Sequence, residues 1–154
     1  MRRKLALAAL LVFAPTAADA ACSVTATGVA FGTYVPSSTS NSTGTVTVSC
    51  SALLGVLFSW TIALNAGVNS GGSFSNRRMA SGSSYLSYQL YTNSGHTTVW
   101  GDGTGGTSTV SGSCLISLLG IPCTGSATVY GQIPALQNPS PGAYTDTITV
   151  TVTY

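Results

Sequence analysis

The chain has 154 residues, of which 44% are hydrophobic and 5% are charged, and its formal net charge is +2. This length allows one domain with a sizeable apolar core. Beyond residue 20 the only charged side chains are those of Arg77, Arg78, Asp102 and Asp146. This charge pattern excludes the clustered basic surface that binds nucleic acid or an anionic membrane.

Residues 1–20 have the pattern of an export signal. Residues 1–4 are basic, residues 5–14 are apolar, and Ala18-Asp19-Ala20 places small residues before the expected cleavage site. The apolar run is too short to span a bilayer, and no second long run follows it. We therefore expect residues 21–154 to be one exported domain without a transmembrane anchor, which passes through the periplasm to the cell surface or an extracellular fibre.

The first half of this domain alternates between apolar and polar residues in short runs, as half-buried strands do. An opening strand with Val24 and Ala26 is interrupted near Gly28 and resumes at Val29 and Phe31. Further inward-facing rows are Val46, Val48 and Cys50, and then Phe58, Trp60, Ile62 and Leu64. Turn-forming residues fill positions 36–44 and 65–72 between the runs.

The second half continues the same alternation. Its rows are Leu86, Tyr88 and Leu90, then Ala127, Val129 and Gly131, and finally Ile148, Val150, Val152 and Tyr154, which alternate with threonines. Residues 101–106 form another turn cluster, and no segment of the domain has sustained helical periodicity. These short strands predict an all-β fold, an immunoglobulin-like β-sandwich of Greek-key type.

The chain has four cysteines, Cys22, Cys50, Cys114 and Cys123. In an exported protein they indicate disulfides rather than a metal site. Three pairings are open, and we favour Cys22 with Cys50 and Cys114 with Cys123 because each cysteine then joins its nearest neighbour in sequence.

Groups suited to catalysis are scarce. His96 lies in a Ser-Gly-His-Thr segment typical of an exposed loop, although a base formed with Asp102 or Asp146 is the alternative. Residues 101–106 lack the lysine of a phosphate-binding loop. We interpret Arg77 and Arg78 as a solvated turn, in which one guanidinium group could bond loop carbonyls. We expect no enzyme activity, no cofactor and no metal.

Several stretches, taken in one order along the chain, resemble the spore coat protein U family, which includes subunits of archaic chaperone-usher pili. The stretches are residues 28–34, 45–50, 62–67, 78–79, 86–91, 99–103, 129–135 with Gln137, and 142–154. The resemblance implies a sandwich that lacks its last strand. A periplasmic chaperone and then a neighbouring subunit, delivered by an outer-membrane usher, would fill the groove with a donor strand.

The resemblance makes the C-terminal row the candidate donor-strand groove, with Ile148, Val150, Val152 and Tyr154 along one side. The alternative is a closed sandwich in which this strand is ordinary core. Subunits that polymerise carry a donor extension before the first cysteine, whereas cleavage after Ala20 would leave only Ala21 there. A tip position or a stand-alone surface protein is therefore favoured over a repeating shaft subunit.

Two apolar stretches do not alternate, one just after Cys50 and one between Cys114 and Cys123. In archaic pilus tips such loops are thought to contact hydrophobic surfaces, so they are candidates for adhesion to an abiotic or host surface. The alternative is that they plug the end of the sandwich. The candidate adhesive residues are Leu53, Leu54, Leu57, Leu115, Ile116, Leu118, Leu119 and Ile121.

Together these features predict a structural or adhesive subunit of a chaperone-usher pilus. A stand-alone secreted coat or matrix protein is one alternative. A small ligand-binding surface module is another, because an exposed Trp100 or tyrosine could stack on a sugar ring.

Overall fold

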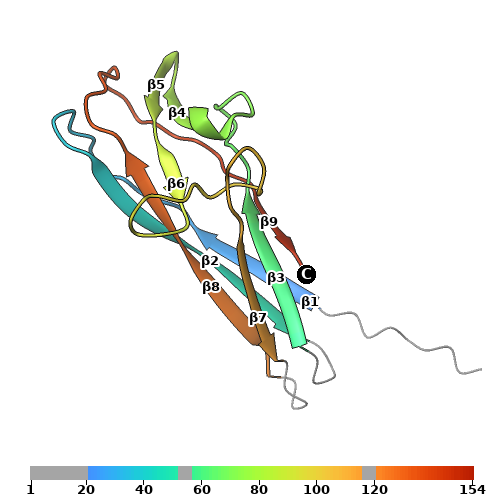
Figure 1. The fold of residues 1–154 in the computed structure, drawn as a ribbon. Coiled ribbons are helices and arrows are strands. Elements are labelled where there is room, and N and C mark those ends of the chain that lie inside the picture. The colour runs from blue at the N-terminus through green and yellow to red at the C-terminus, as the bar shows by residue number, and fades with distance from the viewer. Residues whose placement is uncertain (1–20, 52–56, 116–120) are drawn as a thin grey trace, which may run out of the picture.

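Two antiparallel sheets pack face to face in the computed structural model, which describes residues 21–51, 57–115 and 121–154 (Figure 1). The larger sheet has the spatial order β1 (Ala21–Thr27), β2 (Ser40–Ser51), β8 (Cys123–Ile133) and β6 (Gln89–Tyr91). The smaller sheet has the order β7 (Val110–Leu115), β3 (Leu57–Leu64) and β9 (Val150–Thr153). A hairpin of β4 (Arg78–Ser81) and β5 (Ser84–Ser87) and a 3-10 turn, η1 (Phe74–Asn76), complete the described elements. The predicted all-β, immunoglobulin-like sandwich is confirmed.

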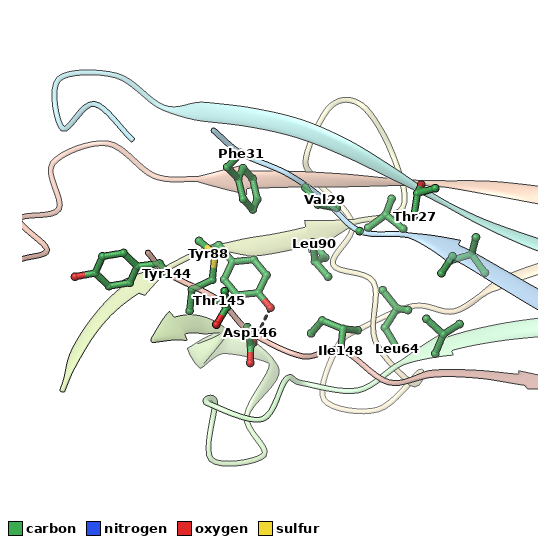
Figure 2. Close-up of a pocket in the computed structure, with 16 residues that line it drawn as sticks. Thr27, Val29, Phe31, Leu64, Tyr88, Leu90, Tyr144, Thr145, Asp146 and Ile148 are labelled. Atoms are coloured by element: carbon green, nitrogen blue, oxygen red, sulfur yellow. Dashed lines mark hydrogen bonds between the residues drawn. The ribbon is translucent and has the colours of Figure 1, made fainter. Parts of the chain in front are cut away.

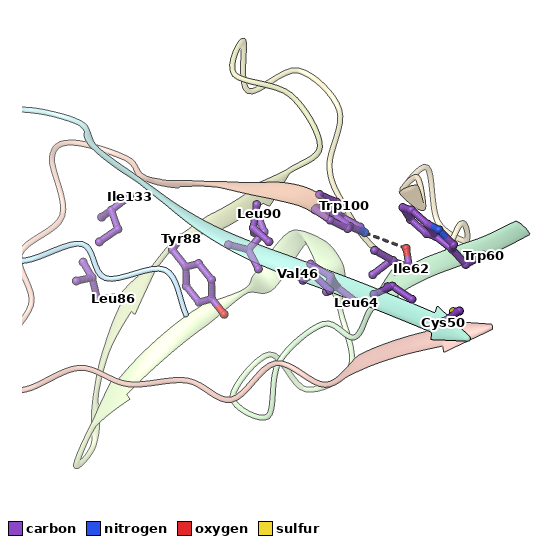
Figure 3. Close-up of a cluster of buried hydrophobic side chains, with 13 residues drawn as sticks. Val46, Cys50, Trp60, Ile62, Leu64, Leu86, Tyr88, Leu90, Trp100 and Ile133 are labelled. Carbon is purple, nitrogen blue, oxygen red and sulfur yellow. Dashed lines mark hydrogen bonds between the residues drawn. The ribbon is translucent and has the colours of Figure 1, made fainter. Parts of the chain in front are cut away.

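The core forms where the inward faces of the two sheets meet, because alternate residues of each strand point to one face. Strand β2 contributes Val46 and Val48, and β3 contributes Ile62 and Leu64, all fully buried (Figure 3). Trp100 reaches into this core from the segment after β6 and has no exposed surface. Its indole N–H donates to the Ile62 carbonyl oxygen at 3.1 Å, so it cannot stack on a bound sugar.

The row Leu86, Tyr88 and Leu90 is buried as predicted, but it does not belong to one strand. Residues before Tyr88 pair with β4, and residues after it pair with β8. The Tyr88 amide donates to the Arg77 carbonyl oxygen at 3.1 Å, at the point where the chain passes from the hairpin to the larger sheet. The alternation therefore persists through a change of sheet.

Strand β7 was not predicted, because its central inward position is Gly112, which interrupts the apolar alternation between Val110 and Cys114. Gly112 lies directly against the indole ring of Trp60, and Gly125 of β8 lies against the same ring. A side chain at either position would overlap the indole. The Trp60 ring thus occupies the space of the apolar side chain that position 112 would need to mark β7 as a strand.

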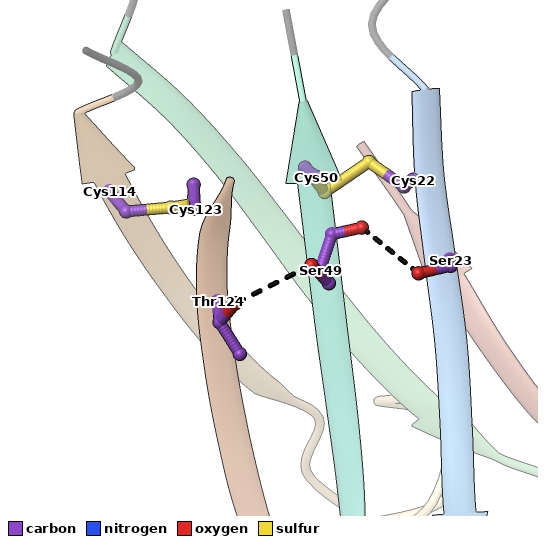
Figure 4. The surroundings of a disulfide bond; sticks show 7 residues. All are labelled: Cys22, Ser23, Ser49, Cys50, Cys114, Cys123 and Thr124. Atoms are coloured by element: carbon purple, nitrogen blue, oxygen red, sulfur yellow. Dashed lines mark hydrogen bonds between the residues drawn. A yellow bond between two sulfur atoms is a disulfide. The ribbon is translucent and has the colours of Figure 1, made fainter. Parts of the chain in front are cut away.

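The disulfides have the favoured pairing, Cys22–Cys50 and Cys114–Cys123 (Figure 4). The first joins neighbouring strands β1 and β2 of one sheet. The second joins β7 to β8, which belong to different sheets, and so ties the sandwich together along that side.

The predicted export signal lies outside the described residues. In the part of the chain that the structure describes, no helix is long and apolar enough to cross a membrane.

Candidate functional site

The side of the sandwich opposite the Cys114–Cys123 disulfide has two strand edges. Strand β1 is the edge of the larger sheet and β9 is the edge of the smaller one. Residues from the end of β1 and just after it, within 26–31, and residues from just before β9 and its first position, within 144–150, line one cavity. We call this side of the sandwich the open side. It consists of β1 with residues 28–31 at the edge of the larger sheet, and of residues 144–153 at the edge of the smaller sheet.

The inward face of β1 is exposed although its neighbours are buried. Val24 pairs with Val48 and Ala26 pairs with Val46, so these side chains share one face of the sheet. Val46 and Val48 are fully buried, whereas Val24 is 42% exposed. Because the sheets face each other over the core, this difference means that no described strand of the smaller sheet lies opposite β1.

The inward face of β9 has the same property. Val150 pairs with Leu64 and Val152 pairs with Ile62. Both partners on β3 are fully buried, but Val150 and Val152 are only partly buried. An apolar row at the edge of each sheet is therefore incompletely covered.

Backbone groups at this side also point outward. The carbonyl oxygens of Thr147 and Thr149 accept hydrogen bonds from the amides of Val68 and Asn65, at 3.2 and 3.0 Å. Since backbone groups alternate between the two edges of a strand, those of Ile148 and Val150 point to the open side. On β1, the Cα atoms of Cys22 and Cys50 lie 4.1 Å apart, the short spacing of a non-hydrogen-bonded pair. The backbone groups of Cys22, Val24 and Ala26 therefore also point to the open side.

A cavity of about 310 Å³ lies between the two edges, and we call it the groove (Figure 2). Its floor is apolar and comes from β2, β3, β6 and β8 through Val46, Leu64, Leu90 and Val129. A second cavity of about 570 Å³ adjoins it and shares Val29, Phe31, Met79 and Tyr144 with its walls. The groove thus opens, past the N-terminal end of β9, into this second cavity, whose lining is more polar.

One end of the groove is polar, because Asp146 lies in its wall. The Tyr88 hydroxyl donates to Asp146 Oδ2 at 2.7 Å, as Figure 2 shows. Asp146 Oδ1 accepts from the side-chain amide of Asn69 at 3.0 Å, from the Asn69 backbone amide at 3.3 Å and from the Thr147 amide at 2.9 Å. Burial, together with the hydrogen bond to Asp146, raises the pKa of Tyr88 far above its usual range. Tyr88 is therefore a neutral donor at any physiological pH.

Arg77 is buried behind this end of the groove and is only 1% exposed, so its assignment to a solvated turn was wrong. Its two terminal nitrogens donate to Gln89 Oε1 at 2.8 Å and to the Asn65 carbonyl oxygen at 2.7 Å. The guanidinium also lies over the Phe74 ring, 5.3 Å from its centroid. Burial lowers the Arg77 pKa, while the charge of nearby Asp146 acts in the opposite direction. The structure shows the alternative that we considered for the arginine pair: the Arg77 guanidinium donates to a loop carbonyl, that of Asn65.

Of the residues predicted for the donor groove, Ile148 and Val150 line it. Val152 packs on the core further along β9, and Tyr154 is exposed beside Phe58, with ring centroids 5.7 Å apart. Three further residues of the groove were not predicted from the sequence: Val29 and Phe31 on the far wall, and Tyr144. Val29 and Phe31 had been recognised as an alternating pair, but alternation alone does not tell which cavity a pair lines.

The candidate adhesive residues that the structure describes are exposed at one end of the sandwich. Leu57 and Leu115 form a cross-strand pair at the end of β3 and β7 and are 70% and 72% exposed. Ile121, close to Cys123, is 61% exposed. Leu53, Leu54, Ile116, Leu118 and Leu119 lie outside the described residues.

The candidates for catalysis are not brought together. His96 is half-buried rather than fully exposed, and its ring packs edge-on against Tyr91 and Tyr130, at centroid distances of 5.2 and 6.5 Å. The exposed carboxylate of Asp102 is bonded to Thr104 of its own loop, which lowers its pKa. Within residues 21–51, 57–115 and 121–154, no group of three or more His, Cys, Asp or Glu side chains is placed to hold a metal ion.

The chain is similar in sequence to known proteins. Residues 7–151 match the family model of the Spore Coat Protein U domain. A similar protein is Protein U of Myxococcus xanthus, 31% identical over 133 residues, which cover 80% of this chain and 70% of that protein. The family consists of structural domains of coats and pili rather than enzymes, and it implies an exported surface protein. The chain therefore belongs to the Spore Coat Protein U domain family.

Proposed function

We propose that this protein is a structural subunit of an extracellular chaperone-usher pilus, and that its open side accepts a donor β-strand. The observation that carries the proposal is the pair of strand edges, β1 and β9, whose inward side chains are incompletely covered and whose backbone groups point outward. Its partners are then a periplasmic chaperone, an outer-membrane usher and neighbouring subunits, each of which supplies or guides the inserted strand.

Strand insertion satisfies both features of the open side at once. Main-chain hydrogen bonds to the free edge of β9 provide affinity, and alternate side chains of the inserted strand fill the groove. Exposed sheet edges with an adjoining apolar surface otherwise promote aggregation. A subunit with such an open side needs a partner from the moment it is exported.

The proposal is tested by producing the chain in a bacterial periplasm with and without its cognate chaperone. We expect a soluble complex with the chaperone and little soluble monomer without it. A fully stable monomer produced alone would contradict the proposal and favour a stand-alone coat or matrix protein.

Val150 and Thr151 provide a matched pair of variants for the same experiment. Val150 lines the groove, whereas Thr151 lies on the outer face of the same strand and is exposed. Val150→Asn places an amide where the inserted strand needs an apolar contact, and we expect about tenfold weaker chaperone binding. Thr151→Asn is expected to bind as the unmodified chain does. Equal binding by both variants would place the chaperone elsewhere.

We further propose that the end of the sandwich where β3 starts and β7 ends adheres to hydrophobic surfaces. Leu57, Leu115 and Ile121 are exposed at this end. The double variant Leu57→Ser with Leu115→Ser should lose most of its retention on polystyrene. Ser59→Ala with Ser113→Ala, the next outward-facing pair on the same strands, is the control. Unchanged retention of the leucine variant would show that these residues do not mediate adhesion.

A further inference from the structure

The open-side wall formed by residues 144–153 has one charged residue, Asp146. Counting inward-facing residues back from the C-terminal end of β9, Val152, Val150 and Ile148 are followed by Asp146. The carboxylate lies in the groove wall between Ile148 and Tyr144. An inserted strand that pairs with this edge therefore meets three apolar positions and then an acidic one.

The Asp146 carboxylate is held in place by neutral donors alone. Oδ1 receives three hydrogen bonds, from the two Asn69 nitrogens and the Thr147 amide, and Oδ2 receives one, from Tyr88. Each carboxylate oxygen offers about two acceptor sites, and Oδ2, against which Gly67 packs on one side, accepts this one hydrogen bond among the described residues. The guanidinium of Arg77 bonds to Gln89 and Asn65 instead. The carboxylate is thus held in a fixed position, and Oδ2 accepts fewer hydrogen bonds than Oδ1.

A purely apolar strand would remove water from this acceptor without replacing the hydrogen bond. Leaving a buried charged group short of a partner is costly, whereas hydrogen bonds to charged groups are among the stronger ones in proteins. A residue directly opposite Asp146 on an inserted strand would have its Cβ roughly 5 Å from that of Asp146, within reach of a hydroxyl or an amine.

We propose that the strand that fills the groove carries a hydrogen-bond donor side chain opposite Asp146, and apolar side chains opposite Ile148, Val150 and Val152. Asp146 then sets both the register and the identity of the strand that is accepted. A slip of one residue turns the apolar face of the strand away from the groove, and a slip of two residues toward Asp146 places an apolar residue over the carboxylate. This inference rests on the proposed strand-accepting function and specifies the chemistry of the partner.

The test supplies the strand from the chain itself. An Asn-Gly turn and a β-strand are added after Tyr154, so that a two-residue hairpin fixes the register of the new strand against β9. The added residues opposite Val152, Val150 and Ile148 are valine or leucine. The residue opposite Asp146 is lysine, serine, leucine or glutamate in four otherwise identical proteins, and a Gly/Ser tail of equal length is the reference. Chemical denaturation gives the unfolding equilibrium constant of each.

We expect the lysine and serine strands to lower the unfolding constant at least about fivefold relative to the leucine strand, with glutamate the least stable. Asp146→Asn should remove most of the advantage of lysine, whereas Asp102→Asn, in an exposed loop, should not. The four proteins with different residues opposite Asp146 all keep Asp146 itself. Their comparison therefore tests the preference for a donor side chain even if Asp146→Asn fails to fold.

The outcomes separate the two proposals. If none of the added strands stabilises the protein beyond the Gly/Ser tail, both the strand-accepting function and this inference are overturned. If all four stabilise it and leucine opposite Asp146 is as good as lysine or serine, the inference is overturned and the strand-accepting function stands.

Discussion

The clearest single-residue constraint is the contact between Trp60 and two glycines. Gly112 on β7 and Gly125 on β8 both touch the indole, and a Cβ atom at either site would overlap it. These glycines belong to the two strands that the Cys114–Cys123 disulfide joins, so the indole fills the space where the two sheets approach on that side. Close packing of this kind leaves little room for even one methyl group.

We therefore expect Gly125→Ala to lower the free energy of unfolding by about 1–3 kcal/mol, the usual cost of overpacking a rigid core. Gly28→Ala is the control, because a Cβ atom there has nothing within 4 Å. The measurement is urea denaturation of the oxidised protein. A Gly125→Ala midpoint equal to that of Gly28→Ala would mean that Trp60 can move aside.

At the scale of strands, the alternating pattern predicted the inward faces of β2, β3 and β8 correctly, because a half-buried strand must repeat every two residues. The N-terminal boundary of β2 was misjudged. Residues 40–44 look like a turn but pair with β8, and Gly44 is needed where the Thr27 carbonyl comes close. Strand β7 was missed for a similar reason, since glycine at an inward position erases the pattern.

The groove could be predicted only in part from the sequence. Ile148 and Val150 follow from the alternation of the last strand, together with the family resemblance. Val24 is exposed, whereas its cross-strand partner Val48 is buried. The difference depends on which strand of the other sheet lies across the core, and a local sequence pattern does not contain that information. The buried position of Arg77 was equally hidden, because its partners Asn65 and Gln89 are distant in sequence and one of them bonds through a backbone carbonyl.

The whole molecule is closed on one side and open on the other. On the closed side β7 adjoins β8, and the disulfide Cys114–Cys123 links them covalently. On the open side, among the described residues, β1 is joined to its own sheet by pairing with β2 and by Cys22–Cys50. This asymmetry should appear in the local stability of the backbone, because edges without a neighbour open at low free-energy cost.

Amide hydrogen exchange of the isolated chain tests this asymmetry within β9. The amides of Thr151 and Thr153 face β3 and should be protected, whereas those of Val150 and Val152 point to the open side and should exchange at least about tenfold faster. In a protein whose groove is filled by an added apolar strand, Val150 and Val152 should become as protected as their neighbours, while Ile62 in the centre of β3 changes little. Strong protection of Val150 and Val152 before any strand is added would show that this edge is already paired, and the sandwich would then be closed.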